Sequence, residues 1–163
     1  MPNNNKHTIS VLVENEFGVL ARVSGMFAAR GYNIDSLSVA TTLDPKFSHI
    51  TLVTSGSPEI IEQILKQLNR LIDVVKVQDL TGENFLNRET ILAKVKADEK
   101  KSPDLLKLIE SYGAEKVDSN ASSLLLQLTG EGEKVEEFVK KLEPFGILKL
   151  IRTGTIAISR EED

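Results

Sequence analysis

The sequence predicts an α+β protein made of two tandem domains. Stretches in which apolar and polar residues alternate, as in strands, are interleaved with stretches whose apolar residues recur every three or four positions, as in helices. The resulting order, β-α-β-β-α-β, occurs twice, and each copy has about 75 residues, a normal size for a small domain. This is the ferredoxin-like plan. We expect domains at 7–80 and 90–160, joined by a linker at 81–89.

The first copy shows its elements through periodicity and helix start signals. Its six elements are expected as strand 7–13, helix 18–30, strands 34–42 and 47–54, a helix from residue 58, and strand 74–80. Ile9, Val11 and Val13 alternate with Thr8, Ser10 and Leu12, which is typical of a strand with one buried face. Ser57 and Pro58 are preferred at the N-cap and first position of a helix, so the second helix begins there.

The second copy repeats the order with different residues. Its elements are expected as strand 90–97, a helix from residue 102, strands 115–119 and 123–129, helix 133–142, and a last strand region at 147–159. Ser102-Pro103 is the same kind of helix start as in the first copy, and Gly113 ends that helix. The last strand region is expected to bend near Gly154.

Composition excludes several classes of function. The net charge of −4 and the 5% aromatic content, without tryptophan, argue against binding to nucleic acid or to an anionic membrane. No apolar run approaches the roughly 20 residues that cross a bilayer. The absence of cysteine excludes disulfides, thiolate metal sites and cysteine catalysis. Residues 1–6 are polar and have no signal-peptide core, so we expect a cytoplasmic protein. The two histidines and the scattered carboxylates form no set for catalysis or metal binding, so we expect no catalytic and no metal-binding residues.

The most informative stretch is 14–40. The first strand runs into a polar turn that contains Asn15, Gly18 follows, and a helix starts at once. The start of a helix has unpaired backbone N–H groups and the positive end of the helix dipole, which together bind small anions such as carboxylates. No nucleophile, general base or metal-ligand set accompanies them. This stretch therefore predicts a receptor for a small acid.

The same stretch carries a family resemblance. The string ISVLVENEFGVLARVSGMFAARGYNIDSLSVA, at 9–40, and the later EQILKQLNRLIDVVKV resemble the regulatory (small) subunit of acetohydroxyacid synthase, also called acetolactate synthase. The resemblance continues in the opening of the second copy and in residues 154–160. It implies an N-terminal ACT domain, a module that binds small ligands. It also implies a non-catalytic protein that binds the catalytic subunit, raises its activity and confers feedback inhibition by a branched-chain amino acid, usually valine. Thiamine diphosphate, magnesium and the flavin FAD are expected on the catalytic subunit, and no cofactor on this chain.

The resemblance also implies an effector site at a dimer interface. Its residues would be Asn15, Gly18, Val19 and Leu20 of one subunit with Asn33 and Ile34 of the other. Read alone, Gly18 is a turn glycine and Asn15 a turn former; read with the helix start and the family, we favour ligand contact for both. Asn33 suits a zwitterion because its amide both donates and accepts, and it also tolerates unusual backbone angles.

Self-association and partner contacts follow as further expectations. Small domains bury a modest fraction of their surface and expose sheet edges, so we expect a homodimer. The loop 42–48 is a candidate contact for the catalytic subunit. The alternative function is a stand-alone ACT-type amino-acid sensor or transcriptional regulator, although no basic helix or helix-turn-helix pattern is present.

Overall fold

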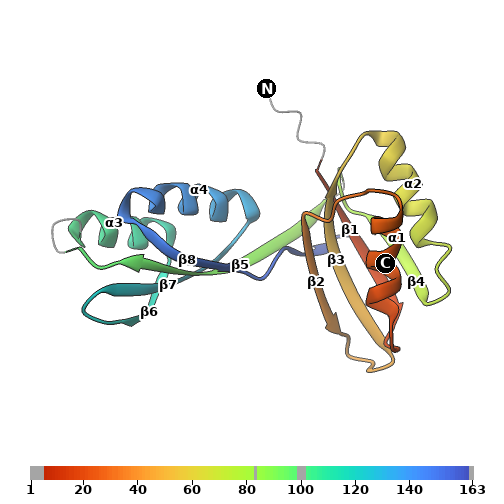
Figure 1. Ribbon diagram of the computed structural model, residues 1–163, viewed down its shortest axis with the longest axis horizontal. Helices are drawn as coiled ribbons and strands as arrows, with labels where there is room; N and C mark the ends of the chain where they lie inside the picture. Colours follow the sequence, from red (N-terminus) through yellow and green to blue (C-terminus); the bar gives the residue numbers. More distant parts are fainter. Residues whose placement is uncertain (1–5, 83, 99–101, 162–163) are drawn as a thin grey trace. The chain divides into compact units, whose positions relative to one another are not determined.

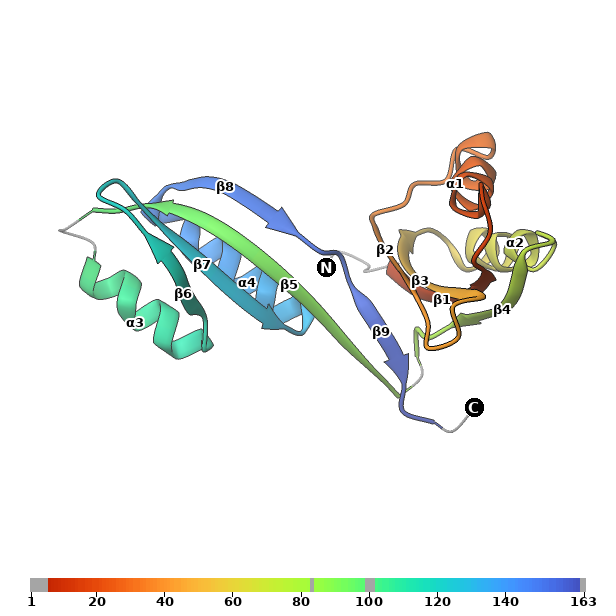
Figure 2. The same ribbon diagram turned by 90° about the horizontal axis from the view of Figure 1, so that it is seen from below.

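Each half of the chain forms an antiparallel sheet with two helices on one face (Figures 1 and 2). The computed structural model describes residues 6–82, 84–98 and 102–161. Two compact units result. Unit 1 comprises the chain up to Leu86 together with the stretch from Thr155 onward, and unit 2 comprises Asn87–Gly154. The predicted α+β class and the double βαββαβ order are confirmed.

Unit 1 has the strand order β2-β3-β1-β4 with antiparallel neighbours. Its elements are β1 (Lys6–Glu14), α1 (Val19–Ala29), β2 (Ser36–Thr41), β3 (Phe47–Ser55), α2 (Pro58–Leu68) and β4 (Val74–Asp79). Every predicted element of this half is present, with ends that differ by two residues or fewer. The central pair, β1 and β3, is in register with Ile9 opposite Leu52 and Glu14 opposite Phe47.

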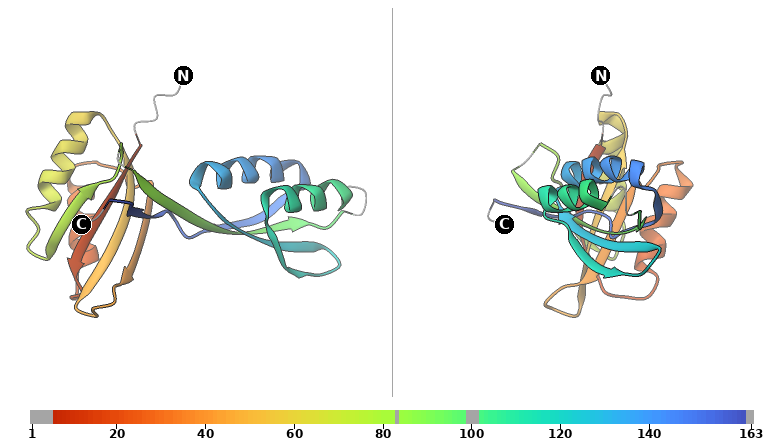
Figure 3. Two further views of the ribbon diagram at one scale, coloured as in Figure 1. Left: turned by 180° about the vertical axis from the view of Figure 1, so that it is seen from behind. Right: turned by 90° about the vertical axis from the view of Figure 1, so that its left-hand side faces the viewer.

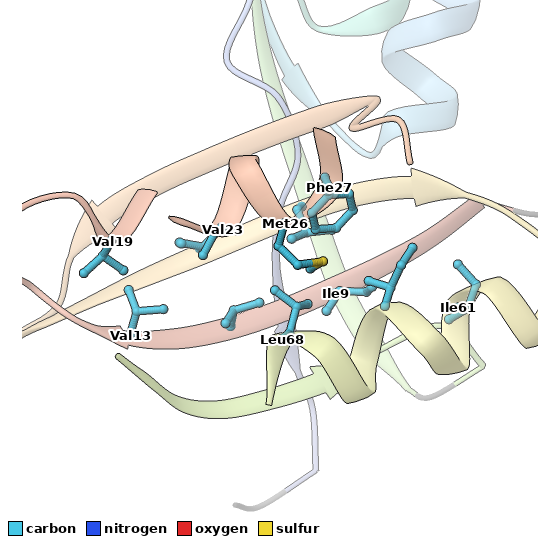
Figure 4. Packing of buried hydrophobic residues seen from close by; sticks show 12 residues of the cluster. Ile9, Val13, Val19, Val23, Met26, Phe27, Ile61 and Leu68 are labelled. Atoms are coloured by element: carbon cyan, nitrogen blue, oxygen red, sulfur yellow. The ribbon is translucent and has the colours of Figure 1, made fainter. Parts of the chain in front are cut away.

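The core of unit 1 lies between the sheet and its two helices (Figure 4). The alternating residues of β1 that the sequence singled out, Ile9, Val11 and Val13, are at most 2% exposed. Val19 of α1 lies beside Val13, and Phe27 packs further along the helix, toward Ile9. The core therefore fixes α1 along its whole length on the sheet.

Unit 2 has the strand order β6-β7-β5-β8. Its elements are β5 (Phe85–Lys96), α3 (Ser102–Tyr112), β6 (Glu115–Ser119), β7 (Ser123–Gly130), α4 (Gly132–Leu142), the 3₁₀ turn η1 (Glu143–Phe145) and β8 (Ile147–Arg152). The ring of the fully buried Phe138 lies 5.2 Å from that of Tyr112. The Lys141 ammonium lies 5.1 Å from the centre of the Tyr112 ring, within the range of a cation–π contact.

A buried ion pair joins β5 to β8 in unit 2. Arg152 donates from Nε and Nη2 to the two carboxylate oxygens of Glu89, both at 2.8 Å, and from Nη1 to Glu136 of α4 at 3.0 Å. The side chain of Glu89 is only 6% exposed. The hydrogen bond with Glu89 raises the pKa of Arg152 above its ordinary value. This cluster ties β8 to the neighbouring strand β5 and to α4.

The boundaries of the two units differ from the predicted ones in two places. The turn at Gly82 exists, but β5 already begins at Phe85, so the linker predicted at 81–89 is largely a strand. The region predicted as one bent strand, 147–159, is two strands, β8 and β9 (Ile156–Ser159). Gly154 separates them with φ of +80°. The bend expected near Gly154 is thus a complete break between two strands.

β9 belongs to unit 1 rather than to the second copy. The Thr155 amide donates to Ser36 Oγ (3.0 Å), and the Arg160 amide donates to the Asn84 carbonyl (2.8 Å). β9 pairs with β5 and lies against β1. Thr51 and Val53, which alternate with the core residues of β3, are also at most 9% exposed. The residues after Gly154 thus complete unit 1.

No helix in the described part of the chain is both long enough and apolar enough to cross a membrane.

Candidate functional site

The start of α1 has the geometry that the sequence predicts for anion binding. Gly18 is the N-cap, with φ of +81°, a left-handed conformation that side chains other than glycine adopt at a cost. The Val19 amide makes only a long bond to the Glu16 carbonyl (3.4 Å), and the next amide, that of Leu20, has no acceptor within the helix. Val19 is buried in the core, so its contribution to a site is its backbone, whereas Leu20 is 41% exposed. Gly18 is therefore required by the backbone whether or not a ligand binds.

Asn15 ties the loop before α1 to the β2–β3 hairpin. Its Nδ2 donates to the Pro45 carbonyl (3.0 Å), its Oδ1 accepts from Ser48 Oγ (3.1 Å), and its amide donates to the Lys46 carbonyl (2.7 Å). The turn-forming interpretation of Asn15 thus has direct support in these contacts. One hydrogen of the side-chain amide is still available to a ligand.

Arg22 also lies beside Gly18, and the sequence reasoning missed it. Its Nε donates to the buried carboxylate of Asp73 (2.6 Å) and its Nη2 to the Phe17 carbonyl (3.3 Å). The hydrogen bond to Asp73 raises the pKa of Arg22. A Cβ placed on Gly18 would come within 3.0 Å of Nη1 of Arg22. Arg22 therefore places an ion-paired guanidinium next to the helix start and fixes the loop that contains Gly18.

Asn33 and Ile34 lie beyond the other end of α1. Asn33 Nδ2 donates to Asp35 (2.6 Å), and the Asn33 carbonyl accepts from Thr54 Oγ1 (2.6 Å). Ile34 is half-buried against the core. Asn33 does not use the unusual backbone angles that asparagine tolerates, because among the described residues only glycines have positive φ, and Gly31 makes the turn at +68°.

The predicted site residues fall into two groups that one chain keeps apart. The 11 residues of α1 rise about 1.5 Å each, which separates Gly18 from the segment of Asn33 by about 16 Å. The sheet leads to a similar separation. Asn15 bonds to Ser48 and Asn33 bonds to Thr54, and these two β3 residues lie about 20 Å apart along the strand. A small amino acid cannot touch both groups in one subunit.

The fold and this helix start define unit 1 as an ACT-type domain, and the family described as the AHAS small subunit-like ACT domain matches residues 9–76. The family described as the small subunit of acetolactate synthase matches residues 88–161. The chain therefore belongs to the family of acetolactate synthase small subunits.

Individual relatives match over almost their whole length. The probable acetolactate synthase small subunit of Archaeoglobus fulgidus is 43% identical over 155 residues, which are 95% of this chain and 97% of that one. The acetolactate synthase small subunit of Mycolicibacterium smegmatis is 42% identical over 154 residues, 94% and 91% of the two chains. The crystal structure of the acetolactate synthase small subunit from Thermotoga maritima superposes with a TM-score of 0.86 at 34% identity, covering 97% of this chain and 99% of that one.

Proposed function

We propose that this chain is the regulatory subunit of acetolactate synthase. It binds the catalytic subunit, raises its activity and makes it subject to feedback inhibition by a branched-chain amino acid, for which valine is the first candidate. The observation that carries the proposal is the match to small subunits over 95% of this chain and 97% of a relative. Thiamine diphosphate, magnesium and FAD are held by the catalytic subunit.

The effector site that we propose is completed by a second copy of the chain. The carboxylate of valine accepts hydrogen bonds from the backbone amides at the start of α1, beside the ion-paired guanidinium of Arg22. The isopropyl group packs between Leu20, which is 41% exposed, and the half-buried Ile34 of the second copy. Asn33 of that copy meets the ammonium group through its side-chain oxygen. The separation of about 16 Å between the two groups in one chain is what supports a shared site.

Binding at such a site acts on the enzyme through the dimer. Valine that contacts both copies stabilises the arrangement in which the two halves of the site meet. The free energy by which valine shifts the enzyme between the two arrangements can be no larger than the difference between the free energies with which valine binds them. The same coupling requires that binding of the catalytic subunit alters the affinity for valine by an equal factor.

The test is isothermal titration of the purified protein with valine, with leucine and isoleucine as comparators, followed by reconstitution with the catalytic subunit. We expect saturable binding near one valine per chain, absent in Gly18→Asp. Gly113→Asp is the control for the left-handed backbone, because Gly113 also has positive φ (+65°) but lies in unit 2; unlike at Gly18, nothing lies within 4 Å of its Cβ position. Full valine inhibition of the enzyme reconstituted with Gly18→Asp would refute the site. Failure of the wild-type protein to activate the catalytic subunit would refute the function.

A further inference from the structure

Three large apolar side chains in unit 1 are almost completely exposed. Phe17 is 98% exposed, Leu43 106% and Ile72 92%, whereas the next most exposed large apolar residue in the described part of the chain, Ile158, reaches 66%. Each of the three lies in a different loop. Phe17 precedes α1, Leu43 is in the β2–β3 hairpin, and Ile72 is in the turn between α2 and β4.

The three loops lie at one end of unit 1, where β1 ends and β4 begins (Figures 1 and 3). Backbone hydrogen bonds join them directly. The Glu14 amide donates to the Asp73 carbonyl (2.8 Å), and the Asn15 amide donates to the Lys46 carbonyl (2.7 Å). The loop before α1 is thus bonded to both of the others. The three loops therefore form one end of unit 1, and we call the surface on which they present Phe17, Leu43 and Ile72 the loop-end surface.

The loops of the loop-end surface are held in fixed conformations. Arg22 bonds to Asp73 and to the Phe17 carbonyl, and thereby ties α1 to two of the loops. In the hairpin, Thr42 Oγ1 donates to the Asp44 carbonyl (2.8 Å), and the Lys46 amide donates to the Asp44 carboxylate (3.0 Å). Exposed apolar groups on a backbone that is already ordered lose little conformational entropy when a partner covers them.

We propose that the loop-end surface docks the catalytic subunit of acetolactate synthase, an inference that rests on the proposed function. A Phe side chain buries about 150–250 Å² and the two aliphatic side chains somewhat less, so the three supply roughly 500 Å². That is less than the roughly 800 Å² that each partner contributes to a standard interface. The three side chains form the central anchors of a larger contact, in the way that a few apolar residues dominate other interfaces.

The shape of the surface favours a different protein over a second copy. In a two-fold contact the same patch meets itself, so it must supply both the protruding groups and the pockets that receive them. Phe17, Leu43 and Ile72 all protrude from loop tips, and their near-complete exposure shows that neighbouring side chains do not enclose them. A partner with apolar pockets fits this surface. Phe17 also adjoins Gly18, so a protein bound there contacts the loop on which the effector is proposed to bind.

The test is the affinity of the full chain for the catalytic subunit, measured by titrating the small subunit into a fixed amount of catalytic subunit and following acetolactate formation. We expect Phe17→Gln/Leu43→Gln/Ile72→Gln to weaken half-maximal activation by at least ~100-fold, and Leu43→Gln alone by ~10-fold, as for anchor residues. Leu106→Gln is the matched control, since Leu106 is a half-exposed leucine of α3 in unit 2. Circular dichroism and valine titration check that the variants remain folded and competent.

Three results would overturn the inference. Activation by the triple variant within threefold of wild type removes the loop-end surface from the contact and leaves the proposed function intact. Loss of self-association in sedimentation, with activation restored at high subunit concentration, assigns the surface to a contact between copies. If wild-type protein itself neither binds nor activates the catalytic subunit, the proposed function fails together with the inference.

Discussion

Replacing Arg152 with methionine should strongly destabilise unit 2. Methionine keeps much of the apolar volume of the side chain but removes all three hydrogen bonds, two of which go to the carboxylate of Glu89. That carboxylate is 6% exposed, so the variant leaves a buried charge without its partner. Removing one partner of a buried ion pair lowers the free energy of unfolding by about 3–5 kcal/mol.

The expected loss lies at the lower end of that range, near 3 kcal/mol, because the Arg152 side chain is 39% exposed and water can partly replace it. A domain is stable by about 0.05–0.15 kcal/mol per residue, so a unit the size of Asn87–Gly154 has about 3–10 kcal/mol in total. The substitution therefore removes between a third and all of the stability of unit 2. The double variant Glu89→Gln/Arg152→Met should recover more than half of the loss, since a neutral amide is far less costly to bury than a charge.

The assay uses tyrosine fluorescence. The chain has two tyrosines and no tryptophan, and Tyr112 lies in unit 2 against Phe138, whereas Tyr32 lies in unit 1. In a Tyr32→Phe background, urea unfolding followed by fluorescence reports on unit 2. The reasoning is refuted if Arg152→Met lowers the free energy of unfolding by less than about 1 kcal/mol, or if the double variant is no more stable than the single one.

Three further predictions concern unit 1. Burial lowers the pKa of His49, so the unfolded chain binds a proton more readily than the folded one. The contribution of His49 to stability should therefore be complete above about pH 6.5 and fall as the pH drops below that value. Melting temperatures recorded from pH 7.5 to 5 should show this decline, and His49→Gln should flatten it. Asn15→Ala should speed hydrogen exchange in 42–46 by roughly 30-fold, because two side-chain hydrogen bonds worth about 1 kcal/mol each are lost and about 1.4 kcal/mol is a factor of ten; unchanged exchange would show that the hairpin does not depend on Asn15. Gly18→Ala should cost about 1 kcal/mol for its left-handed backbone and somewhat more because the new Cβ displaces Arg22, whereas Gly113→Ala should cost the backbone term alone. Melting temperatures measure these costs, and loss of valine binding in Gly18→Ala but not in Gly113→Ala would separate recognition from backbone strain.

The sequence predicted the elements well because each depends on local patterns. The alternation of Ile9, Val11 and Val13 and the Ser57-Pro58 start signal specify a strand and a helix without reference to the rest of the chain. The positive φ of Gly18 follows the same logic, since a glycine between a strand and a helix indicates a conformation that only glycine adopts easily.

The features that the sequence did not reveal depend on distant partners. Arg22 has no local signal, because its role at the helix start is set by Asp73, 51 residues further along the chain. The membership of β9 in unit 1 is equally hidden, since alternation describes which face a residue occupies and not which strand lies beside it. Of the loop-end surface the sequence indicated only the loop 42–48, because the near-complete exposure of Phe17 and Ile72 has no local signal.

The return of the chain to unit 1 after Gly154 makes unit 2 an insertion within unit 1. During synthesis the first 86 residues leave the ribosome long before residues 155–159 are available, so unit 1 lacks this strand for as long as unit 2 is being synthesised. A fragment that ends near residue 80 would lack β9, which lies against β1, and the start of β5. Separate production of unit 1 therefore calls for a chain in which a short linker replaces residues 87–154, keeping the last strand in place.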